Sequence, residues 1–209
     1  MSEKQSQIIV LIFLGILTFG AYLLYYEKQF NLKQNGGLTA SLADLLNKPD
    51  KPLQLKIQNK FSNCKIGISP DSNCTPGAIF ADATVSQICA QGYTKSVRNV
   101  TQKMREKIYA EYGVEYPKPL GSYEVDHFIP LELGGNNDTA NLWTEARDPY
   151  PGFREKDVVE NFLHIEVCAG HVPLSVAQEV IAADWLAVYN ALSSEQIQEI
   201  KTKYPSWAK

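Results

Sequence analysis

The stretch SYEVDHFIPLELGGNNDTANLWT, residues 122–144, decides the fold of this chain. Its first half, residues 122–133, is rich in β-branched and aromatic side chains, and the Gly-Gly-Asn-Asn-Asp run after it has the composition of a turn. Such a turn lets residues 139–144 run back beside the first half. The stretch therefore predicts two short antiparallel strands, with Asp126 and His127 adjacent on the first strand and facing opposite sides of it.

A helix is expected soon after the two strands. Residues 153–169 place apolar side chains among charged ones at helical spacing, and Gly170 stands where such a helix would end. Asp157, Asn161 and His164 follow one another at steps of four and three, so they share one face of this helix. Strand, strand and helix in this order would bring that face within reach of the Asp-His pair.

Helices and turns make up the rest of the chain beyond residue 60. Residues 97–113 carry apolar side chains at four-residue steps, and residues 173–192 form a further amphipathic pattern that the polar tail could extend. Residues 61–80 are dominated by turn-forming residues and should be irregular. We therefore expect an α+β fold, in which a mainly helical domain surrounds a small hairpin and its following helix.

The amino-terminal part of the chain has a different character. Residues 8–26 are uncharged and apolar, and this run matches the roughly 20 residues that span a bilayer. A retained transmembrane helix is expected here, with a cleavable signal peptide as the alternative. The predicted organisation is a short tail at 1–7, the membrane anchor at 8–26, a linker with one short helix at 27–60, and the folded domain at 61–209.

The cysteines bear on the side of the membrane that holds the domain, because lysines on both sides of the predicted span leave its orientation open. All four cysteines lie beyond the span, and two disulfides would suit an exported domain. Four cysteines allow three pairing patterns. The favoured pattern joins Cys64 with Cys74 and Cys89 with Cys168. We expect an extracytoplasmic domain, and four reduced thiols in a cytosolic protein are the alternative.

The charge of the chain is slightly acidic, with 20 Lys and Arg against 23 Asp and Glu and a net charge of −3. This balance gives little non-specific attraction to nucleic acid. A local excess of positive charge lies around the helix predicted near residue 100. It is either a solvated helix face or a patch that contacts phosphates, and its candidate nucleic-acid-binding residues are Lys95, Arg98, Lys103 and Arg105.

An Asp-His pair followed by Ile-Pro-Leu, a Gly-Gly turn, an Asn-Leu and a later helical His resembles the HNH endonuclease motif of the ββα-metal (His-Me finger) nucleases. More narrowly, EVDHFIPLELGGNNDTANLW together with KDVVENFLHIEVC resembles a group of bacterial exported proteins with an HNH-like domain. The similarity runs from about residue 75 to residue 189, and its core motif spans residues 122–170. It implies a ββα-metal unit within the predicted fold.

The resemblance also implies a role for each matching residue. His127 corresponds to the general base that takes a proton from the attacking water, and Asn141 to the residue that braces the turn against the His backbone. Asp126 and His164 correspond to the metal ligands, with Asn161 as a candidate assistant. One carboxylate and one imidazole suit Mg²⁺ or Mn²⁺, with Zn²⁺ possible. Many members of the family carry two helical ligands, often four residues apart; here Glu160 stands four positions before His164 and Asn161 three, and either could assist.

These features together predict a membrane-tethered, metal-dependent endonuclease that hydrolyses phosphodiester bonds of nucleic acid, with DNA favoured over RNA. A divalent ion would stabilise the charge that builds on the phosphate, and an imidazole with a near-neutral pKa is a suitable base for water. The alternative is an inactive envelope domain that keeps the ββα scaffold for binding or assembly, as the incomplete helical ligand set and the negative net charge suggest. The sequence identifies no protein partner.

Overall fold

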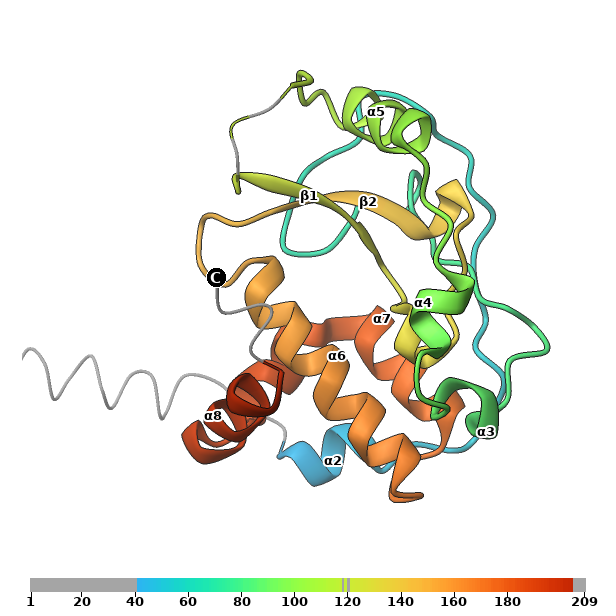
Figure 1. The fold of residues 1–209 in the computed structure, drawn as a ribbon, viewed down its shortest axis with the longest axis vertical. Coiled ribbons are helices and arrows are strands. Elements are labelled where there is room, and N and C mark those ends of the chain that lie inside the picture. Colours follow the sequence, from blue (N-terminus) through green and yellow to red (C-terminus); the bar gives the residue numbers. More distant parts are fainter. Residues whose placement is uncertain (1–40, 118, 120, 205–209) are drawn as a thin grey trace, which may run out of the picture. The chain divides into compact units, whose positions relative to one another are not determined.

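The predicted hairpin forms a two-stranded antiparallel sheet in the computed structural model of the chain (Figure 1). The structure describes residues 41–117, 119 and 121–204. Strand β1 is Tyr123–His127 and strand β2 is Leu142–Ala146. With the helices around this sheet, the described part of the chain is α+β, as the sequence predicts.

The first strand is shorter than predicted, because β1 stops at His127 and the chain does not stay extended to residue 133. Pro130 has no N–H with which to continue a strand ladder, and it instead precedes the 3-10 helix η1, Leu131–Leu133. A second 3-10 helix, η2 at Thr139–Asn141, leads into β2. The connection between the strands is therefore a structured loop that carries most of the conspicuous Gly and Asn residues.

Seven α-helices complete the described part of the chain. Helix α7 is kinked at Asp184, whose carboxylate accepts a hydrogen bond from Ala187 N and so caps the second half. Helix α8 does not extend α7, because Leu192 is extended and Ser193 caps a new helix with its hydroxyl. The helices are α2 Leu42–Leu46, α3 Val85–Ile88, α4 Tyr93–Val97, α5 Gln102–Glu111, α6 Phe153–Cys168, α7 Leu174–Ala191 and α8 Ser194–Lys203.

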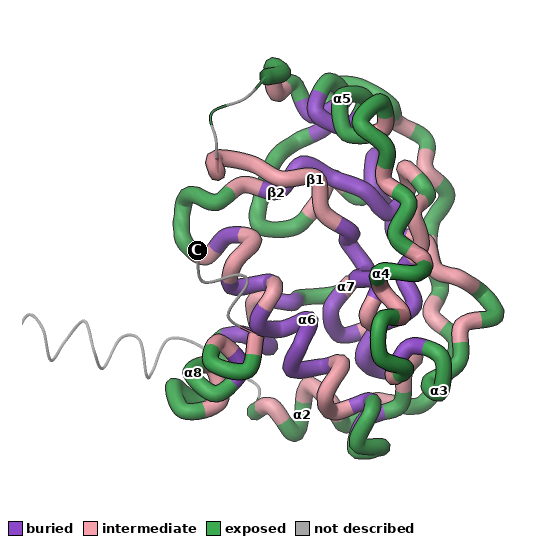
Figure 2. Tube along the Cα trace, in the orientation of Figure 1, coloured by how far each residue is buried: buried purple, intermediate pink, exposed green. Residues whose placement is uncertain are grey.

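Two apolar clusters lie on the two sides of the hairpin. One joins α6, α7 and α8 and contains Trp185, and the other lies between α5 and the hairpin and contains Trp143. Helix α5 covers one side of the sheet and α6 the other (Figure 1), and buried residues follow β2, α6 and α7 (Figure 2). The hairpin is thus held between helices that belong to different apolar cores.

Residues 41–60, predicted to be linker, pack against the folded domain. Apolar side chains of α2 contact the α6–α7 core, and Lys48 Nζ lies 3.4 Å from the Glu179 carboxylate of α7. Residues 41–60 therefore belong to the same compact unit as the rest of the domain. The predicted anchor at 8–26 lies outside the described residues, and no described helix is long and apolar enough to span a bilayer.

Both favoured disulfides are present, Cys64–Cys74 and Cys89–Cys168. The first pins residues 61–80, which are irregular as predicted apart from isolated turns. The second joins the end of α3 to the last residue of α6. No free cysteine remains in the chain.

The longer disulfide should contribute more stability than the shorter one. It closes a loop of 79 positions against 10, so the loop-closure relation gives about 4 kcal/mol for Cys89–Cys168 and about 3 kcal/mol for Cys64–Cys74. We expect the double substitution Cys89→Ala/Cys168→Ala to lower the free energy of unfolding more than Cys64→Ala/Cys74→Ala does, as measured by urea unfolding with tryptophan fluorescence. The opposite ranking would show that native contacts outweigh chain entropy here.

Candidate functional site

His127 lies at the end of β1 with its ring buried and only 2% of the residue exposed. Its Nε2 is 3.2 Å from Oδ1 of Asn137 in the loop between the strands. The Asn137 amide is fixed by the main chain of residues 97–99, because its Nδ2 donates to Val97 O at 2.8 Å and its Oδ1 accepts from Asn99 N at 3.0 Å. Since Oδ1 can only accept, Nε2 must donate, and in the neutral ring the lone pair is on Nδ1.

The environment of His127 favours the neutral imidazole. Burial lowers its pKa, and the positive charges of Arg98 and Lys156 act in the same direction, while Asp126 and the Asn137 hydrogen bond oppose them. With a pKa below the ordinary 6.5, the ring is largely unprotonated at neutral pH. His127 therefore offers a basic nitrogen of defined position, which is what a general base requires.

Asn141 is fully buried and braces the chain that leaves β1. Its Oδ1 accepts from Ile129 N at 2.9 Å, and its Nδ2 donates to Ile129 O and to Asn136 O, both at 2.9 Å. Its main-chain oxygen also accepts from Phe128 N at 2.8 Å. These contacts hold the residues directly after His127 against the loop, which is the geometry expected of a turn-bracing Asn.

The Gly-Gly turn has a steric reason. A Cβ on Gly135 would lie 1.8 Å from Ile129 O, and Gly134 has a φ of 77°, in the left-handed region that favours glycine. The close approach at Gly135 brings Asn141 and Ile129 together. The loop that carries the Asn residues is therefore specified by its two glycines.

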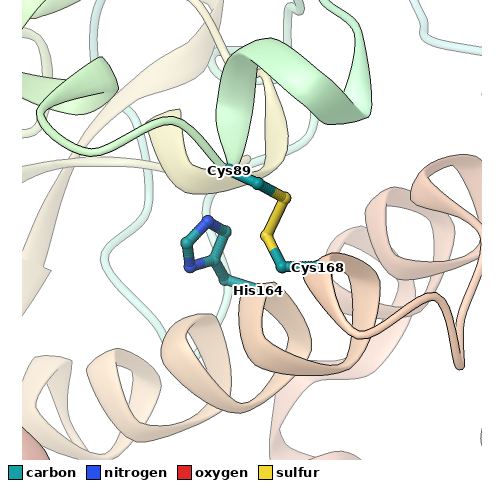
Figure 3. A group of neighbouring side chains, drawn as sticks. All are labelled: Cys89, His164 and Cys168. Atoms are coloured by element: carbon teal, nitrogen blue, oxygen red, sulfur yellow. A yellow bond between two sulfur atoms is a disulfide. The ribbon is translucent and has the colours of Figure 1, made fainter.

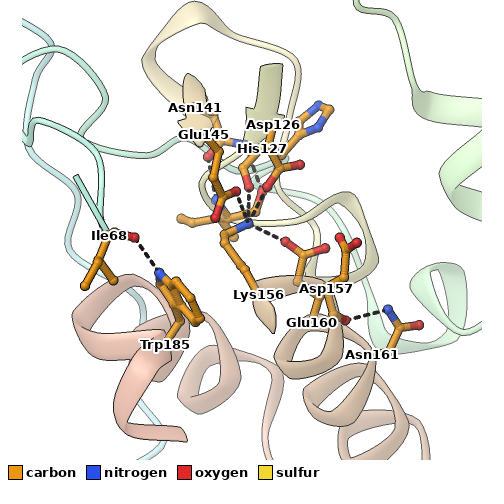
Figure 4. A network of polar contacts seen from close by, with 11 residues as sticks. Ile68, Asp126, His127, Asn141, Glu145, Lys156, Asp157, Glu160, Asn161 and Trp185 are labelled. Atoms are coloured by element: carbon orange, nitrogen blue, oxygen red, sulfur yellow. Dashed lines mark hydrogen bonds and ion pairs between the residues drawn. The ribbon is translucent and has the colours of Figure 1, made fainter. Parts of the chain in front are cut away.

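A buried lysine joins helix α6 to the hairpin (Figure 4). The Lys156 ammonium donates to Asp126 Oδ2 at 2.5 Å, to His127 O at 2.9 Å and to the Glu160 carboxyl group. Glu145 Oε2 lies 4.0 Å from the same nitrogen. Only 1% of the Lys156 side chain is exposed, so this charge is neutralised by the protein and not by water.

Burial and the Lys156 ammonium together set the pKa values of the carboxyl groups in this network. Although burial alone would raise the pKa of Asp126, Lys156 and His127 hold it below the ordinary value. Burial would lower the pKa of Lys156, but the surrounding carboxyl groups hold it well above its ordinary value. Burial raises the pKa of Glu145 and of Glu160 well above 4.5, against the opposing effect of Lys156. Asp126 and Lys156 are therefore held in their charged forms, while Glu145 and Glu160 bind protons more tightly than free carboxyl groups do.

Glu124, Asp126 and Glu145 bring their carboxylate oxygens within 4.8 Å of one another. Glu145 is 2% exposed, and neither of its oxygens has a hydrogen-bond partner among the described residues. Oxygen donors of this kind suit Mg²⁺ or Mn²⁺ in chemical type. Two of the three are ion-paired with Lys156, however, so a cation already lies at this group.

His164 lies away from this network, beside the Cys89–Cys168 disulfide (Figure 3). Its Nε2 is 3.2 Å from Ile88 O. On the helix it follows Lys156, the contact of Asp126, by eight positions, a rise of about 12 Å. The predicted pairing of Asp126 with His164 on one ion is therefore not formed, and the nearby Cys pair is oxidised and offers no thiolate.

Asn161 does not complete a metal site either. Its Nδ2 donates to Asp157 O at 2.9 Å within α6, and Lys156 is the α6 residue that forms an ion pair with Asp126. Of the predicted face, Asp157 lies near enough to Asp126 for that charge to raise its pKa, whereas Asn161 and His164 bond elsewhere and do not meet the Asp-His pair. The residues present do not fit the divalent ion that the resemblance implies at Asp126 and His164.

The predicted basic residues are exposed around α4 and α5. Arg98 follows α4 and is near enough to His127 for its charge to lower the His127 pKa. Arg105 Nη1 donates to Val100 O at 2.8 Å, which holds its guanidinium against the start of α5. Lys95 and Lys103 are exposed. Arg98 is thus the member of this set that lies nearest to the candidate base.

Sequence reasoning missed two residues of the site, Asn137 and Lys156, and named Glu145 only as a candidate outer-shell group. Asn137 belongs to the recognised Gly-Gly-Asn-Asn turn, so its amide could have been proposed as a partner for His127. Glu145 is opposite Glu124 in the strand register, which follows from the hairpin alone. Lys156 gives no such signal, because lysine in an amphipathic helix is ordinarily exposed.

Comparison of the chain with protein-family models, with curated proteins and with solved structures finds no match. The site is therefore interpreted from its own geometry and chemistry.

Substituting Asn137 should change the His127 ring directly. In the parent we expect the Nε2–H tautomer, and in Asn137→Ala a lower His127 pKa, because the acceptor that stabilises the protonated ring is lost. Asn137→Asp should raise the pKa by adding a negative charge. Long-range ¹H–¹⁵N spectra of the histidine rings report tautomer and pKa, and an Nδ1–H tautomer in the parent would contradict the assignment.

Asp157 should make stability fall as pH rises. Burial, together with the nearby charge of Asp126, raises its pKa from 3.8 to about 7. The folded state therefore binds the proton more tightly than the unfolded state, and stability is lost between those two pH values. Between pH 4 and pH 8, we expect the free energy of unfolding of the parent to fall by on the order of 1 kcal/mol relative to that of Asp157→Asn, as measured by urea unfolding. Parallel pH profiles for the two proteins would contradict this.

Proposed function

We propose that this chain is an HNH-like endonuclease, a hydrolase that cleaves phosphodiester bonds of nucleic acid, with DNA favoured over RNA. The observation that carries the proposal is the arrangement of His127, a buried neutral imidazole whose Nε2–H is held by Asn137 and whose following residues are braced by Asn141. This arrangement stands in a strand, strand and helix unit in that order.

The reaction proposed is attack of water on the phosphorus atom. His127 Nδ1 accepts the proton of the water, so that the attacking group approaches as hydroxide, and the bond from phosphorus to the leaving oxygen breaks. The leaving oxygen takes a proton from solvent water, and His127 returns its own to solvent. Asn137 keeps the accepting nitrogen on the correct side of the ring. Asn141 fixes the backbone that carries the ring, which limits the motion that would misalign water and base.

Positive charge for the phosphate would come from exposed residues near His127. Arg98 is the best placed, and Lys95, Lys103 and Arg105 extend the same region along α4 and α5. A guanidinium can hold two phosphate oxygens at once, which fits a role in orienting the backbone of the substrate. The net charge of −3 keeps non-specific binding weak, so contacts of this patch would decide affinity.

The resemblance implies a divalent ion, with Mg²⁺ or Mn²⁺ favoured over Zn²⁺, but the predicted ligands Asp126 and His164 do not lie together to hold it. The tether is a further part of the proposal: residues 8–26 would anchor the chain in a membrane, with the domain on the extracytoplasmic side. Two disulfides support an exported location for the domain, because such bonds persist in oxidising compartments.

A second candidate function is binding or assembly without catalysis. Two observations favour it: His127 is almost completely buried, and Asp126 is ion-paired with Lys156. A cavity of about 320 Å³ also opens beside β2, with largely apolar walls that include Ile68, Pro149 and Trp185, next to the buried Glu145. A cavity of that kind could hold an apolar segment of a partner.

Cleavage of plasmid DNA separates the two functions. We expect the full chain, purified in a mild detergent, to convert supercoiled plasmid to nicked and linear forms, and His127→Ala to lose about 100-fold or more in rate, as removal of a general base does. His171→Ala is the matched control, because His171 is exposed and bonded only to Glu166 among the described residues. Equal cleavage by His127→Ala and the parent would refute the mechanism.

A further inference from the structure

The cation that contacts Asp126 in this structure is the ammonium group of Lys156. In the ββα unit that the sequence resembles, a metal ion is expected between the first strand and the helix. Lys156 comes from α6 and reaches β1, and its ammonium contacts oxygens of Asp126 and of His127 on the strand and of Glu160 on the helix. These contacts use all three N–H groups of the ammonium.

We propose that Lys156 takes the place of the divalent ion: its ammonium is the resident cation of Asp126, and the native chain binds no Mg²⁺ or Mn²⁺ at that carboxylate. The inference deepens the proposed nuclease function and rests on it for its catalytic meaning. The assignment of the cation itself stands on the geometry of the network.

Burial argues that the ammonium is a permanent member of the site. A lysine charge with 1% of its side chain exposed is retained only when it is paired, because the cost of removing it from water is several kcal/mol. Moving the ammonium aside would leave Asp126 and Glu145 buried without their cation. The chain therefore has no inexpensive rearrangement that would vacate the position for a metal.

Charge repulsion argues against a second cation at the same carboxylate. A magnesium or manganese ligand oxygen lies about 2 Å from the ion. With the ammonium 2.5 Å from Asp126 Oδ2, both cations would lie within a few ångströms of each other in a water-poor interior. Unit charges that close repel strongly even at the effective dielectric of a protein surface, and a divalent ion doubles the effect.

The same geometry predicts what removing the ammonium would create. Lys156→Met keeps an unbranched side chain, one atom shorter and without the charge, and leaves the carboxyl groups of Asp126, Glu145 and Glu160 around a space without a cation. Three carboxyl groups are a suitable donor set for Mn²⁺. The substitution should therefore generate a metal site that the native chain lacks.

The test is Mn²⁺ binding by the full chain in a mild detergent, with free Mn²⁺ measured by electron paramagnetic resonance. We expect the parent and Asp126→Asn to give the same curve, without a saturable site. Lys156→Met should gain a saturable Mn²⁺ site that the parent lacks, while Lys156→Arg, which keeps the charge, should not. Lys107→Met is the matched control, because Lys107 pairs with Glu111 four residues on in α5, at an exposed position.

Saturable binding by the parent that Asp126→Asn abolishes would overturn the proposal, and so would a folded Lys156→Met that gains no binding. If either variant fails to fold, the parent alone tests the proposal, through the paramagnetic broadening of its NMR signals by Mn²⁺. Selective broadening of the His127 ring signals would place the ion at Asp126 and overturn the proposal. Broadening of exposed carboxylates only would support it.

Cleavage in the presence of a chelator separates this inference from the proposed function. If the parent cleaves in EDTA and His127→Ala does not, the result supports both the nuclease function and the lysine assignment. No cleavage under any condition, together with no Mn²⁺ at Asp126, removes the nuclease function and leaves the lysine assignment standing. Cleavage that needs Mn²⁺ bound at Asp126 supports the nuclease and overturns the lysine assignment.

Discussion

The ion pair between Lys156 and Asp126 is the contact on which the rest of the site depends. The two apolar clusters of the domain lie on opposite sides of the hairpin, one with α5 and one with α6, α7 and α8. The Lys156 network lies where α6 meets β1, so a buried polar contact makes this junction. Buried polar contacts are directional, unlike apolar packing, and this one sets the position of the Asp126–His127 corner on the helix.

Much of this fold follows from local pattern. The hairpin, the helix after it and the two disulfides were all predictable, because turn residues, helical periodicity and cysteine spacing are properties of short stretches of chain. The end of β1 was not, since Pro130 turns the chain into η1 although the residues around it favour a strand. The role of residues 41–60 was missed because their packing against α7 is a long-range contact that their polar composition does not indicate.

The strand half of the site was better predicted than the helix half, for a physical reason. Periodicity shows which residues of a helix share a face, but not how the helix is rotated against the sheet. Cys168, one turn beyond His164, is bonded to Cys89, which holds the end of α6 against α3 and turns His164 toward Ile88. Lys156 then reaches Asp126, and neither contact can be read from the spacing within α6.

Asn137 takes both of its orienting contacts from the main chain, Val97 O and Asn99 N. Peptide groups are present whatever the side chains are, so residues 97–99 could differ in sequence while the His127 tautomer remained the same. Arg98 lies between these two contacts and points its exposed side chain outward. The loop thus separates two tasks: its backbone fixes the chemistry of the imidazole, and its side chains are free to change what the surface beside it recognises.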